Sequence, residues 1–122
     1  MTIREAIGEV DRLRKNTYAQ KDKISWLSRL DLRVKHKVLD THQGNPAADF
    51  AGYNEKTELD TQLLVPAPYD EMYLRYLEAQ MEYYDQQEDR YNNAIDLFDS
   101  IWDDFVKWYN RNHMPLGQKL KF

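Results

Sequence analysis

The chain has 122 residues, enough for one domain with a modest core, and its 42% hydrophobic and 31% charged residues predict a folded chain rather than a disordered one. A formal net charge of −4 argues against a basic nucleic-acid-binding patch. Cysteine is absent, which excludes disulfides and cysteine-based zinc sites, and no apolar run is long enough to span a membrane.

Two amphipathic helices are predicted in the first third of the chain. The first, over about residues 3–14, follows a capping box formed by Thr2 and Glu5. The second, over about residues 20–41, ends before the helix-breaking Gly44-Asn45-Pro46. Its apolar face consists of Ile24, Leu27, Leu30, Val34 and Val38.

Residues 43–62 show no hydrophobic period and are predicted to form a long loop, with Phe50 and Tyr53 as aromatic anchors. A loop of this length is uncommon in a small domain and is often functional. Residues 63–65, Leu-Leu-Val, are predicted to form a short extended segment after the loop.

The run LLVPAPYDEMY, residues 63–73, marks the approach to a third helix over about residues 70–85. A residue that precedes proline favours an extended backbone, so Leu63–Ala67 is expected to be extended. Pro68 is then expected at the first helical position, where its missing N–H costs nothing. The apolar residues of this helix cover a wide arc, which predicts contacts with more than one neighbour.

A fourth helix is predicted over about residues 88–111. Its apolar residues fall within about 80° on a helical wheel: Tyr91, Ile95, Phe98, Trp102, Phe105 and Tyr109. Short connections between the first two helices and between the last two favour antiparallel pairs. The predicted fold is therefore all-α, a four-helix, bundle-like single domain over residues 1–114 with a tail at 115–122.

Aspartates form a second stripe on the fourth helix, away from its predicted core face: Asp89, Asp96, Asp99 and Asp103, with Asp85 added if the helix begins earlier. One interpretation is a solvated face that keeps the protein in solution. The alternatives are cation binding or an acidic wall that faces a partner or a channel.

Tyrosine is concentrated between residues 69 and 91, where six of the nine tyrosines lie. These rings either fill the core or form a protein interface, in which tyrosine is enriched, and both can hold for different tyrosines. The candidate interface residues of the loop and the third helix are Phe50, Tyr53, Pro66, Pro68, Tyr69, Tyr73, Tyr76 and Tyr84.

The tail LGQKLKF alternates apolar and basic residues: Leu116, Lys119, Leu120, Lys121 and Phe122. It is either a frayed terminus or a segment that orders when it docks on a partner. The three histidines lack metal-ligand spacing, and no serine lies in a nucleophile-elbow motif. The sequence thus predicts no enzyme activity, no cofactor and no metal.

Four runs in this order resemble the small head–tail connector (adaptor) proteins of tailed bacteriophages and prophages of Firmicutes. They are MTIREAIGEVDRLRKNTY, DKISWLSRLD, LLVPAPYDEMYLRYLEAQMEY and DRYNNAIDLFDSIWDDFVKWYNRNHMP. The resemblance covers about residues 1–115. One departure lies between the last two helices, where such sequences usually place an Asn-Gly-like turn and this chain has Asp85-Gln86-Gln87.

The resemblance implies a structural virion protein, made in the bacterial cytoplasm, that acts at the head–tail junction. Copies form a ring, usually twelve-fold, between the portal protein and a stopper or tail-completion protein, and double-stranded DNA passes through the lumen. The C-terminal segment, here about residues 114–122, reaches toward the portal. The aspartate stripe would then line the lumen, because an acidic wall does not grip phosphates.

Two rival functions are a helical module that binds a single protein, such as a phage or host regulator, and a hydrolase or metal enzyme. The first would be a monomer or dimer without ring assembly. The second would need carboxylates or histidines that converge in a pocket.

Overall fold

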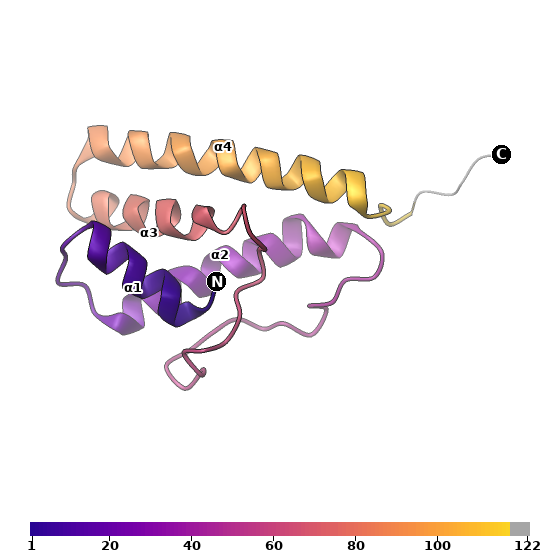
Figure 1. The fold of residues 1–122 in the computed structure, drawn as a ribbon, viewed down its shortest axis with the longest axis horizontal. Coiled ribbons are helices and arrows are strands. Elements are labelled where there is room, and N and C mark those ends of the chain that lie inside the picture. Colours follow the sequence, from indigo (N-terminus) through magenta and orange to yellow (C-terminus); the bar gives the residue numbers. More distant parts are fainter. Residues whose placement is uncertain (118–122) are drawn as a thin grey trace.

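A computed structural model describes residues 1–117, and the predicted all-α, four-helix fold is confirmed for this part of the chain. The elements in chain order are α1 (Ile3–Leu13), α2 (Gln20–Lys37), the 3-10 helix η1 (Leu39–Thr41), α3 (Glu71–Tyr84) and α4 (Glu88–Asn112). α3 and α4 lie side by side and antiparallel (Figure 1). No helix among these elements is long and apolar enough to cross a membrane.

The first helix begins as its capping box predicts. The Thr2 hydroxyl accepts a hydrogen bond from the Glu5 N–H at 3.1 Å, and the Glu5 carboxylate accepts one from the Thr2 N–H at 3.1 Å. The exposed N–H groups of the first turn find partners in the long loop, because Ile3 donates to the Thr61 carbonyl and Arg4 to the Leu59 carbonyl. The loop therefore completes the start of α1.

The second helix ends at Lys37, four residues earlier than the predicted boundary at residue 41. At its end, the Val38 carbonyl accepts hydrogen bonds from the Thr41 hydroxyl and from the His42 ring, each at 2.7 Å. The Thr41 N–H donates to the same carbonyl at 3.3 Å, the i→i+3 bond of a 3-10 helix, so the two side chains add to a tighter turn and the chain continues as η1.

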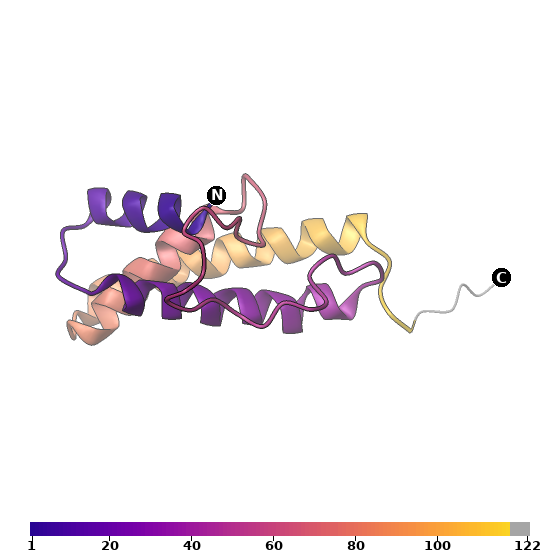
Figure 2. The same ribbon diagram turned by 90° about the horizontal axis from the view of Figure 1, so that it is seen from below.

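The long loop packs on the helices (Figure 2). Gly52 has a positive φ of 101°, and a Cβ at this position would lie 2.6 Å from the Ser28 hydroxyl of α2. The next residue, Tyr53, donates its N–H to the same hydroxyl at 2.8 Å. Glycine thus allows the loop backbone to lie directly against α2.

The proline segment differs from its prediction, because it turns where an extended lead-in was expected. The Tyr69 N–H donates to the Pro66 carbonyl at 3.0 Å, and the Ala67–Pro68 peptide bond is cis. The first helical residue of α3 is Glu71, so the expectation of Pro68 at the first helical position is wrong. The predicted extended segment 63–65 is not a strand either, although Leu63 and Val65 are buried.

The core lies between α4, α3 and the first two helices. From α4 it contains Ala94, Phe98, Phe105 and Tyr109, which follow the predicted apolar stripe. α3 contacts α1, α2 and α4, as its wide apolar arc predicts. A helix with neighbours on three sides has little surface left for partners, and this limits where an interface can form.

Candidate functional site

The acidic face of α4 is exposed along most of the helix. The side chains of Asp89, Asp96, Asp99 and Asp103 all reach solvent, and none of them takes part in an ion pair among residues 1–117. Lys107, four residues beyond Asp103, adds one positive charge at the C-terminal end of this face. We call the four aspartates the acidic face.

Asp85 does not belong to the acidic face, because α3 ends before it and α4 begins only at Glu88. Its carboxylate accepts a hydrogen bond from the Tyr18 hydroxyl at 2.5 Å and pairs with Arg14 at 2.6 Å. The Tyr18 hydrogen bond and then the Arg14 contacts hold the pKa of Asp85 below its ordinary value. Asp85 thus fixes the end of α3 to the connection between α1 and α2.

Two of the candidate interface tyrosines lie in the core. Tyr73 is fully buried, and Tyr76 packs its ring against Phe98 with 5.5 Å between the ring centroids. Neither ring is accessible to another molecule in this fold. Their assignment to an interface is corrected, and for these two residues the alternative of core packing holds.

Tyr53 and Tyr73 instead converge on Asp31, a buried carboxylate of α2. Their hydroxyls donate to its two oxygens at 2.5 and 2.6 Å, and the Leu64 N–H donates to it at 3.1 Å. Burial raises the pKa of the Asp31 carboxyl, while these three hydrogen bonds oppose that rise. Asp31 therefore ties the loop, α2 and α3 together, a role the sequence analysis missed.

The remaining candidate interface residues do not form one patch. Phe50 packs on Tyr53 in the loop, whereas Tyr69, before α3, packs between Phe105 and Trp108 of α4. Pro66 and Pro68 are exposed at the turn before α3, and Tyr84 lies at the other end of α3.

Two exposed aromatic side chains lie at the C-terminal end of α3. Figure 1 shows this end of the molecule, where the ribbon of α3 turns into α4. Tyr83 and Tyr84 are 61% and 53% exposed, and their rings meet edge to face at 5.3 Å. Tyr84 stacks on Trp26, which in turn contacts Tyr18. We call these four residues and Tyr91, which contacts Tyr83, the aromatic end.

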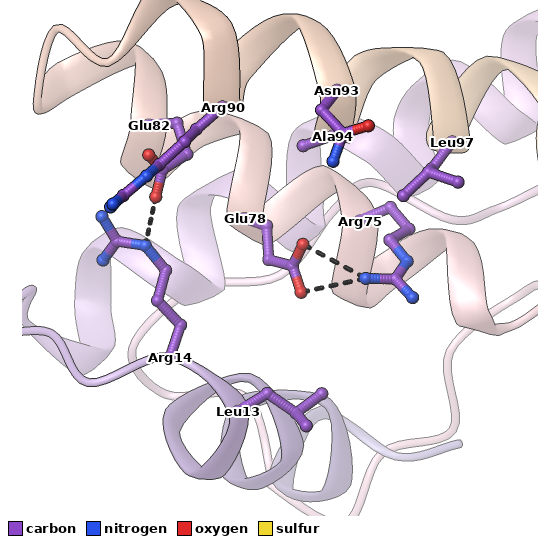
Figure 3. Close-up of a pocket in the computed structure, with 9 residues that line it drawn as sticks. All are labelled: Leu13, Arg14, Arg75, Glu78, Glu82, Arg90, Asn93, Ala94 and Leu97. Atoms are coloured by element: carbon purple, nitrogen blue, oxygen red, sulfur yellow. Dashed lines mark hydrogen bonds and ion pairs between the residues drawn. The ribbon is translucent and has the colours of Figure 1, made fainter.

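A hollow of about 300 Å³ lies between α1, α3 and α4 (Figure 3). Two ion pairs line it: Arg14 with Glu82, and Arg75 with Glu78 at 3.2 Å. Arg90 lies beside the first pair, and Leu13 and Leu97 form exposed apolar edges. Among the described residues, no three His, Cys, Asp or Glu side chains converge as a metal site would require.

The C-terminal tail begins on a well-defined anchor. The Leu116 N–H donates to the Thr41 carbonyl at 2.9 Å, and the Gln43 N–H donates to the Met114 carbonyl at 2.8 Å. Leu116 itself is 56% exposed. The other predicted tail residues, Lys119, Leu120, Lys121 and Phe122, lie outside the described residues.

No family model, curated protein or solved structure matches this chain.

The turn between α3 and α4 contains a non-glycine residue with a positive φ. Gln86 has a φ of 58°, the left-handed conformation that Asn or Gly adopts at lower cost. We expect Gln86→Gly to raise the free energy of unfolding by about 0.5–1 kcal/mol, measured by urea denaturation. Gln87→Gly is the matched control, because Gln87 has a φ of −101° and gains nothing from glycine. Equal losses of stability in both variants would contradict this prediction.

Proposed function

We propose that this chain is a structural subunit of a phage head–tail connector ring, placed between a portal protein and a stopper or tail-completion protein. The four sequence runs that resemble such connectors support this proposal, and they cover about residues 1–115. The all-α fold is compatible with it. In this proposal the protein acts at the head–tail junction of the virion, and its partners are further copies of itself and the two neighbouring proteins.

The observation that carries the proposal is the acidic face of α4. From Asp89 to Asp103 it extends for about 21 Å along the helix, since each helical residue advances 1.5 Å. Exposed carboxylates without cationic partners repel the phosphates of DNA, whereas lysine or arginine would bind them. A ring with this face toward its lumen would let double-stranded DNA pass without binding it.

A closed ring of identical subunits also needs two different contact surfaces on each copy. The aromatic end is one candidate, because Tyr83 and Tyr84 expose much of their rings to solvent. A second surface of different chemistry must lie elsewhere on the same subunit. The exposed proline turn and the C-terminal end of α4 both lie away from the aromatic end (Figure 1).

The test is electron microscopy of the purified chain at high concentration, alone and mixed with its cognate portal protein. The expected result is a ring on the portal, with the copy number set by the portal. Assembly of rings without the portal would also support the proposal. Absence of any complex with the cognate portal would contradict it.

A second candidate function is a helical module that binds one partner protein, and the aromatic end favours it. Two exposed aromatic rings, Tyr83 and Tyr84, clustered at one place on the buried Trp26 are typical of a single binding surface. Such a module would remain a monomer or dimer at high concentration and would bind a partner other than the portal. Light scattering with and without the portal distinguishes the two functions.

A further inference from the structure

A second hollow, of about 310 Å³, opens at the aromatic end, with residues of α2, α3 and α4 in its walls. It is lined by the rings of Tyr83, Tyr84 and Tyr91, by the Gln80 amide and by the Arg29 guanidinium. No aspartate or glutamate of residues 1–117 lines it. We call these five residues the donor hollow, because each side chain can donate a hydrogen bond.

The side chains of the donor hollow are not engaged elsewhere in the fold. In the part of the chain that the structure describes, none of the five makes a side-chain hydrogen bond or an ion pair. Arginines elsewhere in the chain do pair with carboxylates, as Arg14 does with Glu82 and Arg75 with Glu71. The donor hollow therefore holds a positive charge and hydrogen-bond donors that the chain itself does not use.

Arg29 lies on the side of α2 that faces the other two helices. Burial raises the pKa of the Tyr76 hydroxyl of α3, and the positive charges of Arg29 and Arg33 oppose that rise. The Arg33 guanidinium lies over the Trp102 ring, 4.5 Å from its centroid. No such ring lies under Arg29 among residues 1–117, and Arg29 is exposed. Arg29 thus remains available to a ligand at the aromatic end.

The chemistry that fits the donor hollow is a carboxylate on an apolar segment. A guanidinium group binds a carboxylate through two parallel hydrogen bonds, and tyrosine hydroxyls can donate to the same oxygens. Tyr83 and Tyr84 are 61% and 53% exposed, so their rings offer contact area beyond the carboxylate itself. Tyrosine and arginine are also the residues enriched where protein partners bind most strongly. A small free anion would leave these rings uncovered, whereas a protein segment would cover them.

The surroundings of the donor hollow disfavour a nucleic acid. Tyr91 lies on α4 between Asp89 and Asp96, two residues of the acidic face. A strand of nucleic acid on the hollow would bring a row of phosphates near these carboxylates, and like charges repel. A single carboxylate brings one negative charge, which Arg29 neutralises. The charges therefore favour a protein segment over a polyanion.

We propose that the donor hollow binds an aspartate or glutamate side chain of a partner protein. The carboxylate lies on Arg29 and the tyrosine hydroxyls, and the apolar side chains that flank it lie on the rings of Tyr83 and Tyr84. The inference rests on the second candidate function, in which the aromatic end binds one partner protein. It adds the chemistry that this partner presents.

The test begins with a selection of short random peptides, displayed on yeast, for binding to the full-length chain. The selected peptides should share one acidic residue next to apolar residues. Fluorescence anisotropy then measures the affinity of the tightest one, and Arg29→Gln should weaken it about ten-fold because a charge-assisted hydrogen bond is lost. Tyr83→Ala should weaken it by a similar factor because an exposed ring is lost. Replacing the acidic residue of the peptide with its amide should weaken binding to the unmodified chain but not to the Arg29→Gln variant.

Matched controls separate the donor hollow from the rest of the surface. Arg111→Gln removes an exposed arginine at the other end of α4, and Leu97→Ala removes an exposed apolar side chain that does not line the hollow. Both control variants should bind the peptide as the unmodified chain does. Equal losses in test and control variants, or a selection that yields no acidic peptides, would overturn the inference. Displacement of the peptide by an equal concentration of acetate, or of a short single strand of DNA, would overturn it too.

The portal and light scattering separate this inference from the function on which it rests. If the chain remains a monomer with the portal and binds no acidic peptide, the inference is overturned and the second candidate function stands. If the chain forms rings on the portal and the peptide binds with the effects above, the inference stands and the second candidate function is overturned. Rings that Arg29→Gln disrupts would make a second copy the occupant and would overturn the inference.

Discussion

Asp31→Ala is expected to lower the free energy of unfolding by about 3–5 kcal/mol, among the largest effects of any single substitution in this chain. The carboxylate is fully buried and accepts hydrogen bonds from Tyr53, Tyr73 and the Leu64 N–H. Alanine leaves all three donors without this acceptor, and each stranded donor costs about 1–3 kcal/mol. Burial of a carboxylate costs free energy, and alanine removes this cost, which offsets part of the loss. Urea denaturation measures the result.

The effect of Asp31 on stability should also depend on pH. Burial raises the pKa of its carboxyl in the folded state above the ordinary value of 3.8. The folded state then binds the proton of Asp31 more tightly than the unfolded chain does, so protonation of Asp31 stabilises the folded state. This stabilisation is complete below pH 3.8 and is lost as the pH rises through the pKa of the folded state. The difference in unfolding free energy between the unmodified chain and Asp31→Ala should therefore shrink as the pH rises from 3.8.

Asp49→Ala is the matched control for Asp31→Ala, because it removes the same group from an exposed loop position. We expect a change within about 0.5 kcal/mol and no pH-dependent difference. If Asp31→Ala proves no more destabilising than Asp49→Ala, the proposed link between the loop, α2 and α3 is wrong.

The helices could be predicted from the sequence wherever one apolar face dominates. The stripe of α4 has a single direction, so its buried residues Phe98, Phe105 and Tyr109 follow from spacing alone. α3 contacts three neighbouring helices, and its apolar residues point in most directions. Spacing therefore could not separate the core residues Tyr73 and Tyr76 from the exposed Tyr83 and Tyr84.

The hydrogen bonds of Asp31 could be predicted only in part. Asp31 interrupts the apolar stripe of α2, four residues after Leu27 and three before Val34, and this is a signal of a buried carboxylate. Its partners Tyr53 and Tyr73 lie 22 and 42 residues away, and helical periodicity carries no information on such pairs.

α3 begins at Glu71, next to the predicted residue 70, but the expectation of Pro68 at the first helical position is wrong for a related reason. The prolines were interpreted from local preferences, whereas a turn closed by Tyr69 and Pro66 precedes the helix. The tertiary contacts of Tyr69 with Phe105 and Trp108 of α4 lie far beyond the local window on which such preferences are based.

In the proposed connector ring, reversing the acidic face is expected to slow the passage of DNA. The triple variant Asp96→Lys, Asp99→Lys and Asp103→Lys changes the charge of each subunit by six units, from −4 to +2. All three side chains are exposed, so the fold should persist. Three new lysine–phosphate contacts per subunit should make DNA binding fall about forty-fold between 50 and 200 mM salt. The measurement is the rate of DNA release from assembled head–connector complexes.

Free subunits cannot distinguish a lumen wall from any other surface, because a basic patch binds DNA wherever it lies. The control is therefore a second triple variant, Asp49→Lys, Glu55→Lys and Glu58→Lys, which makes the same change of charge on the exposed loop. Both variants should bind DNA as free subunits, but only the α4 variant should slow DNA release from the assembled complex. Equal slowing by both variants would mean that the rate of DNA release depends on the total charge of the subunit and not on where the charge lies. The proposal that α4 lines the lumen would then be wrong.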